Sequence, residues 1–288
     1  MRFDPKTDIY PYPEDTDKHY LKVTKDDGTV FDENYPYVDK SKSFIRKQKF
    51  LKFWICIIIF PLTHIRLGLR IKGRKNLKKH KELLKKGTLS CSNHVHMWDY
   101  LSIMNGVRFR KTNMLVWDKN VSGESGKSVR LVGGIPIPDH NMKATIECFK
   151  QVDELINSGG WLHIYPEGSM WEYYAPIRPF KSGAAYFACK NNKPIVPMAF
   201  SYRKPNWVRR LIFRQIATFT LNIGEPLLPD ESLPIHEREI DLTKRCHEAV
   251  CRLAGFMPGE NIYEPIFHNS KRIDYYTTMY GAKYKGSK

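Results

Sequence analysis

Residues 87–99 read GTLSCSNHVHMWD and contain the features from which the fold can be inferred. A short strand-like run, 87–91, precedes His94, and Asp99 follows five positions after that histidine. Five positions turn the direction around a helix by roughly 140°, so the two side chains cannot share one helix face. We expect them to meet only if His94 lies in a loop after the strand and Asp99 in the first turn of the next helix. A histidine oriented by a carboxylate is a common general base near neutral pH.

The His-x4-Asp spacing is not sufficient on its own to indicate a site. It recurs at His236 and Asp241, where the charged run 236–239 is typical of a solvated helix start. The surroundings of His94, rather than the spacing, therefore indicate a functional site.

Short apolar runs alternate with helical patterns on the C-terminal side of this stretch. We expect strands at 88–92, 114–117, 134–137, 161–165, 195–200 and 217–223, and helices at 98–107, 142–156, 182–190 and 237–253. In the second helix the apolar face is predicted to comprise Ile146, Phe149, Val152 and Ile156. Strands that alternate with helices predict a single α/β domain over 87–256, with a largely parallel or mixed sheet flanked by helices.

The positive charge of the chain is concentrated ahead of this domain. The net charge is +17, and between Lys40 and Lys86 sixteen basic residues face one acid, Glu82, which gives 16 − 1 = +15. Such a segment predicts an anionic partner, such as an anionic membrane surface, an acidic carrier protein or nucleic acid. A solvated, solubilising face is the alternative.

An apolar run, 53–62, lies inside this basic segment. It is shorter than the roughly 18–20 apolar residues of a spanning helix, and Pro61, His64 and Arg66 are expected to interrupt any extension. It also begins too late for a signal peptide. Residues 46–86 are therefore predicted to form basic amphipathic helices that lie in a membrane interface, with a buried core element as the alternative.

The ends of the chain have a different texture. Residues 1–45 predict an irregular extension, and 257–288 a C-terminal tail rich in Tyr and Lys. The six cysteines show no Cys-x2-Cys spacing, so we expect reduced thiols. Together with the absence of a recognisable signal sequence, this predicts a peripheral or monotopic protein on the cytoplasmic face of a membrane.

Three further motifs follow in the chain: GGIPIP at 133–138, YPEGS at 165–169 and RPFKSGA at 178–184. The glycines of the first allow close approach of a ligand or a neighbouring strand. The second places Glu167 at the carboxyl end of a strand, where open α/β sheets bind ligands. The third places Arg178 and Lys181 at the start of a helix, which predicts a phosphate site.

The order of these motifs resembles that of the glycerophospholipid acyltransferases, and most closely the 1-acylglycerol-3-phosphate acyltransferase group. The resemblance covers about 85–225 and rests on five motifs in register: NHVHMWD at 93–99, GIPI at 134–137, YPEGS at 165–169, FKSGA at 180–184 and VPMA at 196–199. The basic segment ahead of them is similar to the membrane-binding helices of bacterial members.

The resemblance implies direct acyl transfer, without an acyl-enzyme, from acyl-CoA or acyl carrier protein to a lysophospholipid, here expected to be 1-acylglycerol-3-phosphate, which would give phosphatidic acid. We expect no cofactor, metal or nucleic-acid partner. His94 would take the proton of the acceptor hydroxyl, and Asp99 would hold His94 in the required tautomer. The substrate-binding residues predicted from the motifs and the resemblance are Asn93, Lys119, Gly134, Glu167, Gly168, Ser169, Arg178 and Lys181.

The chain departs from the family pattern at three places. Met170 stands where the family usually has an arginine, 138–140 lack the arginine of the usual Asp-Arg pair, and His96 replaces a frequent serine. These arginines are associated with the acceptor phosphate. Basic residues that could replace them are Lys119, Arg130, Lys143, Arg178 and Lys181. The acceptor could also be another lysolipid or glycerol-3-phosphate.

Other interpretations use the same residues differently. Cys91, His94, His96 and Asp99 could ligate a metal, although no second ligand cluster follows in the sequence. Cys91 could instead be a nucleophile with His94 as its base, as in a thioesterase. A non-enzymatic membrane- or nucleic-acid-binding module would use only the basic segment.

Overall fold

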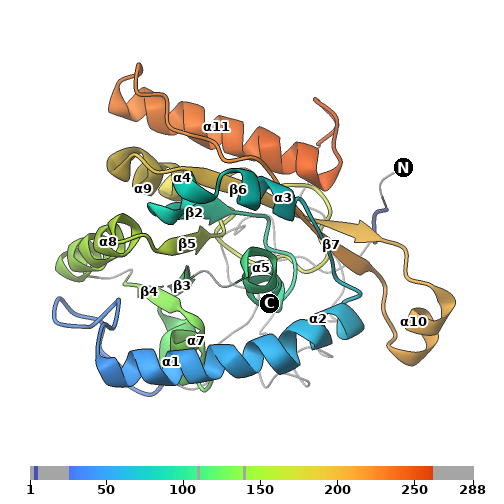
Figure 1. Cartoon of the computed structure of the whole chain (residues 1–288), viewed down its shortest axis with the longest axis horizontal. Helices are drawn as coiled ribbons and strands as arrows, with labels where there is room; N and C mark the ends of the chain where they lie inside the picture. The colour runs from blue at the N-terminus through green and yellow to red at the C-terminus, as the bar shows by residue number, and fades with distance from the viewer. Residues whose placement is uncertain (1–2, 6–25, 109–110, 139–140, 262–288) are drawn as a thin grey trace, which may run out of the picture.

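One sheet of seven strands organises the protein in the computed structural model, which describes residues 3–5, 26–108, 111–138 and 141–261 (Figure 1). The strand order is β1-β7-β6-β2-β5-β3-β4. The bounds are β1 Arg70–Lys72, β2 Thr88–Cys91, β3 Thr112–Trp117, β4 Gly134–Ile137, β5 Trp161–Ile164, β6 Ile195–Arg203 and β7 Thr218–Ile223. The central strand β2 is parallel to both of its neighbours, β5 and β6. Among the paired strands of the described residues, β6 and β7 are antiparallel and the other pairs are parallel, so the predicted α/β class with a largely parallel sheet is confirmed.

Helices cover both faces of this sheet (Figure 1). On one face lie α8 Met142–Asn157, α9 Gly183–Asn191 and α11 Ile235–Ala254. On the other face lie α5 Asp99–Val107, the N-terminal helix α1 Lys42–Trp54 with its continuation α2 Phe60–Arg66, and the short α3 Arg74–Lys79 and α4 Lys81–Lys85. The short helices α6 Lys119–Ser122, α7 Gly126–Val132 and α10 Trp207–Ile212 lie in connections between strands.

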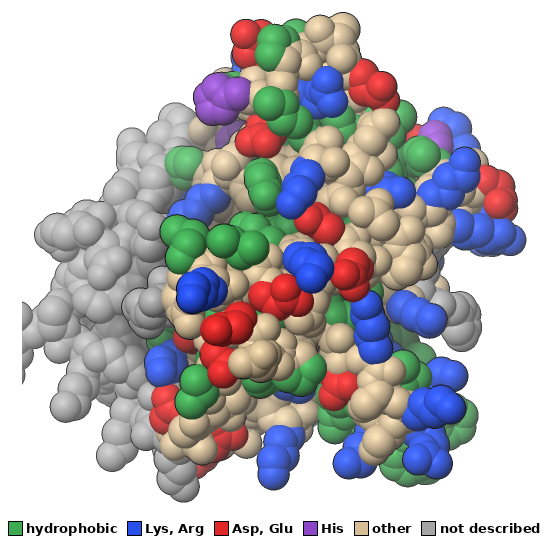
Figure 2. Space-filling model, turned by 90° about the vertical axis from the view of Figure 1, so that its left-hand side faces the viewer, with side chains coloured by type: hydrophobic (Ala, Val, Ile, Leu, Met, Phe, Trp, Pro, Cys, Tyr) green, Lys and Arg blue, Asp and Glu red, His purple; other side chains and the backbone are tan. Residues whose placement is uncertain are grey.

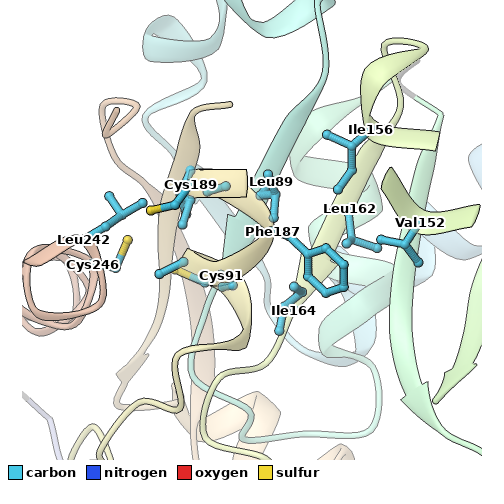
Figure 3. Packing of buried hydrophobic residues seen from close by; sticks show 14 of the residues in the cluster. Leu89, Cys91, Val152, Ile156, Leu162, Ile164, Phe187, Cys189, Leu242 and Cys246 are labelled. Atoms are coloured by element: carbon cyan, nitrogen blue, oxygen red, sulfur yellow. The ribbon is translucent and has the colours of Figure 1, made fainter. Parts of the chain in front are cut away.

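The strands divide the hydrophobic core because successive side chains point to opposite faces. Leu89 and Cys91 of β2 belong to the cluster beneath α8, α9 and α11, together with Phe187 and Cys246 (Figure 3). Ser90, between them, points to the other face and carries polar contacts instead. This polar side of β2 lies directly beneath the His94 loop.

Each strand and helix predicted for 87–256 is present, with small shifts of the ends. The apolar face of α8 was predicted incorrectly in one respect, because Ile146 is 63% exposed. The fully buried residues are Ala144, Cys148, Val152 and Ile156, spaced four apart. Ile146 follows Ala144 by two positions, which turns it about 200° away from that face.

The N-terminal helix is longer than the sequence pattern predicted. It runs without a break from Lys42 to Arg66, with a π-helical turn at Ile55–Ile59 just before Pro61. The expected interruption at Pro61 is therefore wrong. The helix is long and apolar enough to cross a bilayer by length and composition alone, and 17% of its most apolar window is buried in the protein. Ile55 and Phe60 pack on the domain.

The segments predicted before and after the domain also differ from the structure in detail. Arg70–Lys72, within the predicted membrane segment, forms the edge strand β1 and pairs with β7. In the predicted irregular extension, 26–41 contain no helix or strand, although Tyr37 is fully buried. Of the predicted tail, 262–288 lie outside the described residues.

Candidate active site

The loop 92–98 carries His94 from the carboxyl end of β2 to the start of α5. Asn93 anchors this loop to β6, because its amide donates to the carbonyl of Phe200 (3.1 Å) and accepts from the Phe200 N–H (2.8 Å). Asn93 is completely buried, so its observed contacts position the loop.

His94 and Asp99 meet in the predicted way. The distance between His94 Nδ1 and Asp99 Oδ2 is 3.1 Å, with the histidine in the loop and the aspartate at the first residue of α5. The same Oδ2 accepts the N–H groups of Val95 (2.6 Å) and His96 (2.9 Å). Burial raises the pKa of Asp99, while the His94 contact and these N–H groups act in the opposite direction.

The His94 ring remains accessible above this buried carboxylate. The His94 side chain is 23% exposed and that of Asp99 is 2% exposed. The imidazole stacks on the ring of Tyr165, at 3.9 Å between centroids and 13° between planes. Of the described residues, none hydrogen-bonds Nε2 of His94, so this nitrogen is available for a substrate hydroxyl.

A buried polar cluster supports the loop from below. The two ring nitrogens of His163 on β5 contact the hydroxyls of Ser90 (2.9 Å) and Ser92 (3.3 Å), and Ser92 donates to the carbonyl of Asn93. Burial, and secondarily the neighbouring His94, lower the pKa of His163 to about 3. His163 is therefore a neutral supporting residue, and it was not predicted as part of the site.

Glu167 and Arg178 form a buried ion pair beside the loop, at 3.2 Å. Glu167 Oε2 also accepts the backbone N–H of His94, and Oε1 accepts the N–H of Arg178, both at 3.0 Å. Arg178 donates to the hydroxyl of Ser169 (2.9 Å), and its guanidinium lies 4.5 Å above the ring of Trp171. Both side chains thus hold the backbone of the site.

Lys181 lies over the turn that contains Gly168. Gly168 has φ +82°, a conformation that favours glycine, and a Cβ there would be 3.2 Å from the Cε and Nζ of Lys181. The Lys181 N–H donates to the carbonyl of Pro166 (2.9 Å), one residue before Glu167. A cationic side chain thereby reaches the turn that the sequence predicted to bind an acceptor.

Other predicted residues lie elsewhere. Gly134 begins β4, three strands from β2 at the edge of the sheet, and packs against Val129. Lys119 forms an ion pair with Asp26 (2.9 Å). Arg130 donates to the carbonyls of Pro36 and Tyr37 and so fastens the N-terminal segment.

Cys91 does not reach the site. Its side chain is fully buried on the opposite face of the sheet, next to Cys246 (Figure 3). The hydrogen bond to Cys246 and burial raise the pKa of the Cys91 thiol well above its ordinary value. These contacts disfavour a nucleophilic or metal-binding Cys91, because both roles need an accessible thiolate.

His96 is buried and makes contacts other than those of His94. It is 4% exposed, accepts the N–H of Trp98 at its Nδ1 (3.0 Å) and lies 3.9 Å from Glu172 through Nε2. Across the described ranges, no three His, Cys, Asp or Glu side chains are grouped so that they could hold a metal ion.

A family model matches the central part of the chain. Residues 68–201, from just before β1 to within β6, match the acyltransferase family model. These residues make up a little under half of the chain and are similar to the acyltransferase family. The match includes the His94 loop, the Glu167 turn and the Arg178 ion pair.

Individual acyltransferases are more distant. A chloroplastic 1-acyl-sn-glycerol-3-phosphate acyltransferase of Brassica napus is 26% identical over 51% of this chain and 40% of its own length. A chloroplastic 1-acyl-sn-glycerol-3-phosphate acyltransferase of Arabidopsis thaliana is also 26% identical, over 57% of this chain and 42% of its own length. The chain thus spans about two fifths of these relatives. The crystal structure of the 1-acyl-sn-glycerophosphate acyltransferase PlsC from Thermotoga maritima is 17% identical with a TM-score of 0.46, and covers 75% of this chain and 83% of that one.

Proposed function

We propose that this protein transfers an acyl group from an acyl thioester to the free hydroxyl of a lysophospholipid. The observation that carries the proposal is the 3.1 Å contact between His94 Nδ1 and the buried carboxylate of Asp99, below an accessible Nε2. A carboxylate at Nδ1 fixes the tautomer in which Nε2 accepts a proton. Such a base fits a hydroxyl acceptor.

The proposed reaction is a direct transfer. His94 Nε2 takes the proton from the acceptor hydroxyl while that oxygen attacks the thioester carbonyl. The tetrahedral intermediate collapses, the carbon–sulfur bond breaks, and the proton on Nε2 passes to the departing thiolate. The products are an ester and a free thiol, so Asp99 stabilises the transient imidazolium without itself being protonated.

The proposed acceptor is 1-acylglycerol-3-phosphate, the substrate in the names of the curated relatives. Lys181 beside Gly168 supports a phosphate-bearing acceptor, because its ammonium lies at the turn between β5 and α9. The contacts of Arg178 with Glu167 and Ser169 support a positioning role for that arginine. The proposed acyl donor is acyl-CoA or acyl carrier protein.

The test is thiol release by the purified full chain. Acyl-CoA and acyl carrier protein should each be offered with 1-acylglycerol-3-phosphate, glycerol-3-phosphate and a lysolipid without a phosphate monoester. We expect release only with an acceptor present, and the highest rate with 1-acylglycerol-3-phosphate. The His94→Ala variant should lose at least about 10³-fold. Normal turnover by that variant would contradict the mechanism, while preference for another acceptor would contradict only the substrate assignment.

A further inference from the structure

The connection between β6 and β7 exposes a compact group of large apolar side chains. It folds into the short helix α10, capped by Asn206, whose side chain accepts the N–H of Arg209. None of the residues in α10 is buried. The exposed apolar side chains are Trp207 (73%), Leu211 (71%), Ile212 (69%) and Phe213 (44%). Apolar side chains gathered on one surface, unlike a single exposed leucine, indicate a binding surface.

The charge around this group has a single sign. From 201 to 224 the sequence contains five basic residues and no acidic one. Three of the cations, Lys204, Arg210 and Arg214, are exposed. The opposite end of the molecule, at the left in Figure 1, shows acidic and basic side chains next to one another on its described surface (Figure 2). The β6–β7 connection, called the α10 hairpin below, thus combines exposed apolar side chains with positive charge alone.

The hairpin is fastened to the end of the N-terminal helix. Arg209 donates to the carbonyls of Ile65 (2.7 Å) and His64 (3.3 Å), the last residues of α2 before Arg66. Ile65 itself is 54% exposed. Further apolar side chains are exposed along the same helix: Phe50, Phe53, Trp54, Ile57 and Ile58. Figure 1 shows α2 and α10 at the same end of the molecule, where the Arg209 contacts join them.

We propose that the α10 hairpin is a second lipid-contacting element, which inserts Trp207, Leu211, Ile212 and Phe213 into the interface of an anionic membrane. Aromatic side chains favour the headgroup region, aliphatic ones the acyl boundary, and exposed arginines the lipid phosphates. Because the α10 hairpin is joined to the N-terminal helix, simultaneous membrane contact by both elements would fix the orientation of the domain. It would also make binding stronger than either contact alone. The choice of a lipid partner rests on the proposed function. The acyl-transfer chemistry itself does not require the hairpin surface.

The first experiment measures binding of the full chain to phosphatidylcholine vesicles with and without phosphatidylglycerol. Replacing Trp207, Leu211 and Ile212 together by Ser should lower the partition coefficient at least about tenfold on both kinds of vesicle. Arg210→Gln should lower it about fivefold on the anionic vesicles only, and high salt should remove that difference.

The matched control replaces Met142, Ile146 and Ile240 by Ser. These side chains are equally apolar and 56–76% exposed, but they lie on α8 and α11, away from the hairpin. The control variant should bind vesicles like the wild type. Equal binding by the hairpin variant and the wild type would overturn the proposal. So would a wild-type dimer that the hairpin variant dissociates in the absence of lipid, since the surface would then join two copies of the chain.

The second experiment locates the hairpin directly. Brominated phosphatidylcholine quenches tryptophans at the acyl boundary, so Trp207→Phe should remove a quenched component of the emission. Unchanged quenching would overturn the insertion. Neither measurement needs acyl transfer, so loss of vesicle binding and failure of the thiol-release assay are separate outcomes.

Discussion

The backbone N–H of His94 donates to Oε2 of Glu167, 73 positions later in the chain, at 3.0 Å. The two residues follow the neighbouring parallel strands β2 and β5, whose carboxyl ends meet at one edge of the sheet. Arg178 completes the contact by binding the same carboxylate. The position of the candidate base therefore depends on a buried ion pair that does not touch its imidazole.

Glu167→Gln should destabilise the protein and lower its activity. The substitution removes the Glu167 charge that pairs with the buried Arg178 and replaces one accepting oxygen by a donor. Loss of one partner of a buried ion pair costs about 3 kcal/mol of the free energy of unfolding. Denaturant unfolding measures this change, and thiol release should fall about 10-fold or more because the His94 loop loses its anchor.

Glu154→Gln is the matched control for this change. Glu154 pairs with Lys40 at 2.6 Å, but the two side chains are 48% and 64% exposed. An exposed ion pair contributes about 0–1 kcal/mol, so the control should unfold close to the wild type. Equal stability of the two variants would contradict a structural role for Glu167.

The sequence was sufficient to predict the central part of the fold. Apolar runs and helical periodicity located β2 to β7 and α5, α8, α9 and α11, because these elements are long or bury a regular face. The edge strand Arg70–Lys72 was missed, since it has three residues and two of them are basic. Its strand conformation is set by pairing with β7, which is a tertiary contact.

The candidate site was predictable only where it is local in sequence. His94 and Asp99 lie within one loop and helix start, so their contact followed from spacing. Arg178 was expected to bind phosphate, and its burial against Glu167 depends on how the chain returns to the β5 turn after Trp171. His163 gave a weak signal, a histidine within an apolar strand, although its partner Ser90 lies on the adjacent strand.

Asp99→Asn should abolish most activity without destabilising the fold. The three donors at the Asp99 carboxylate all bind Oδ2, and an amide oxygen can occupy that position. Burial raises the pKa of Asp99 in the folded protein, so the protonated side chain stabilises the fold at low pH. This stabilisation is lost as the pH rises through the raised pKa, because the ionised carboxylate is costly to bury at neutral pH. The free energy of unfolding at pH 7 should equal or exceed that of the wild type, whereas kcat should fall about 10²-fold or more. Wild-type kcat would contradict the role of Asp99.

His163 should make the protein acid-sensitive. Its pKa is lowered to about 3 in the folded state, against about 6.5 in an unfolded chain. The unfolded state then binds a proton first, so stability is complete above pH 6.5 and declines by about 1.4 kcal/mol per pH unit towards pH 3. His163→Gln removes this dependence while keeping a donor and an acceptor for Ser90 and Ser92. The loss of unfolding free energy between pH 7 and pH 5 should be about 2 kcal/mol smaller in the variant. An equal loss of unfolding free energy in the variant and the wild type would contradict the lowered pKa of His163.

Lys181→Gln should weaken binding of a phosphate-bearing acceptor selectively. The ammonium lies over Gly168, so its removal takes a positive charge from the turn next to Glu167. We expect KM for 1-acylglycerol-3-phosphate to rise about tenfold, with little change in KM for acyl-CoA, because one charge-assisted hydrogen bond contributes about 1.5–3 kcal/mol. Lys150→Gln, a lysine on α8 whose side chain is 66% exposed, is the control and should leave both constants unchanged. A uniform rise in both constants for Lys181→Gln would indicate a distorted turn, and no rise would place the acceptor phosphate elsewhere.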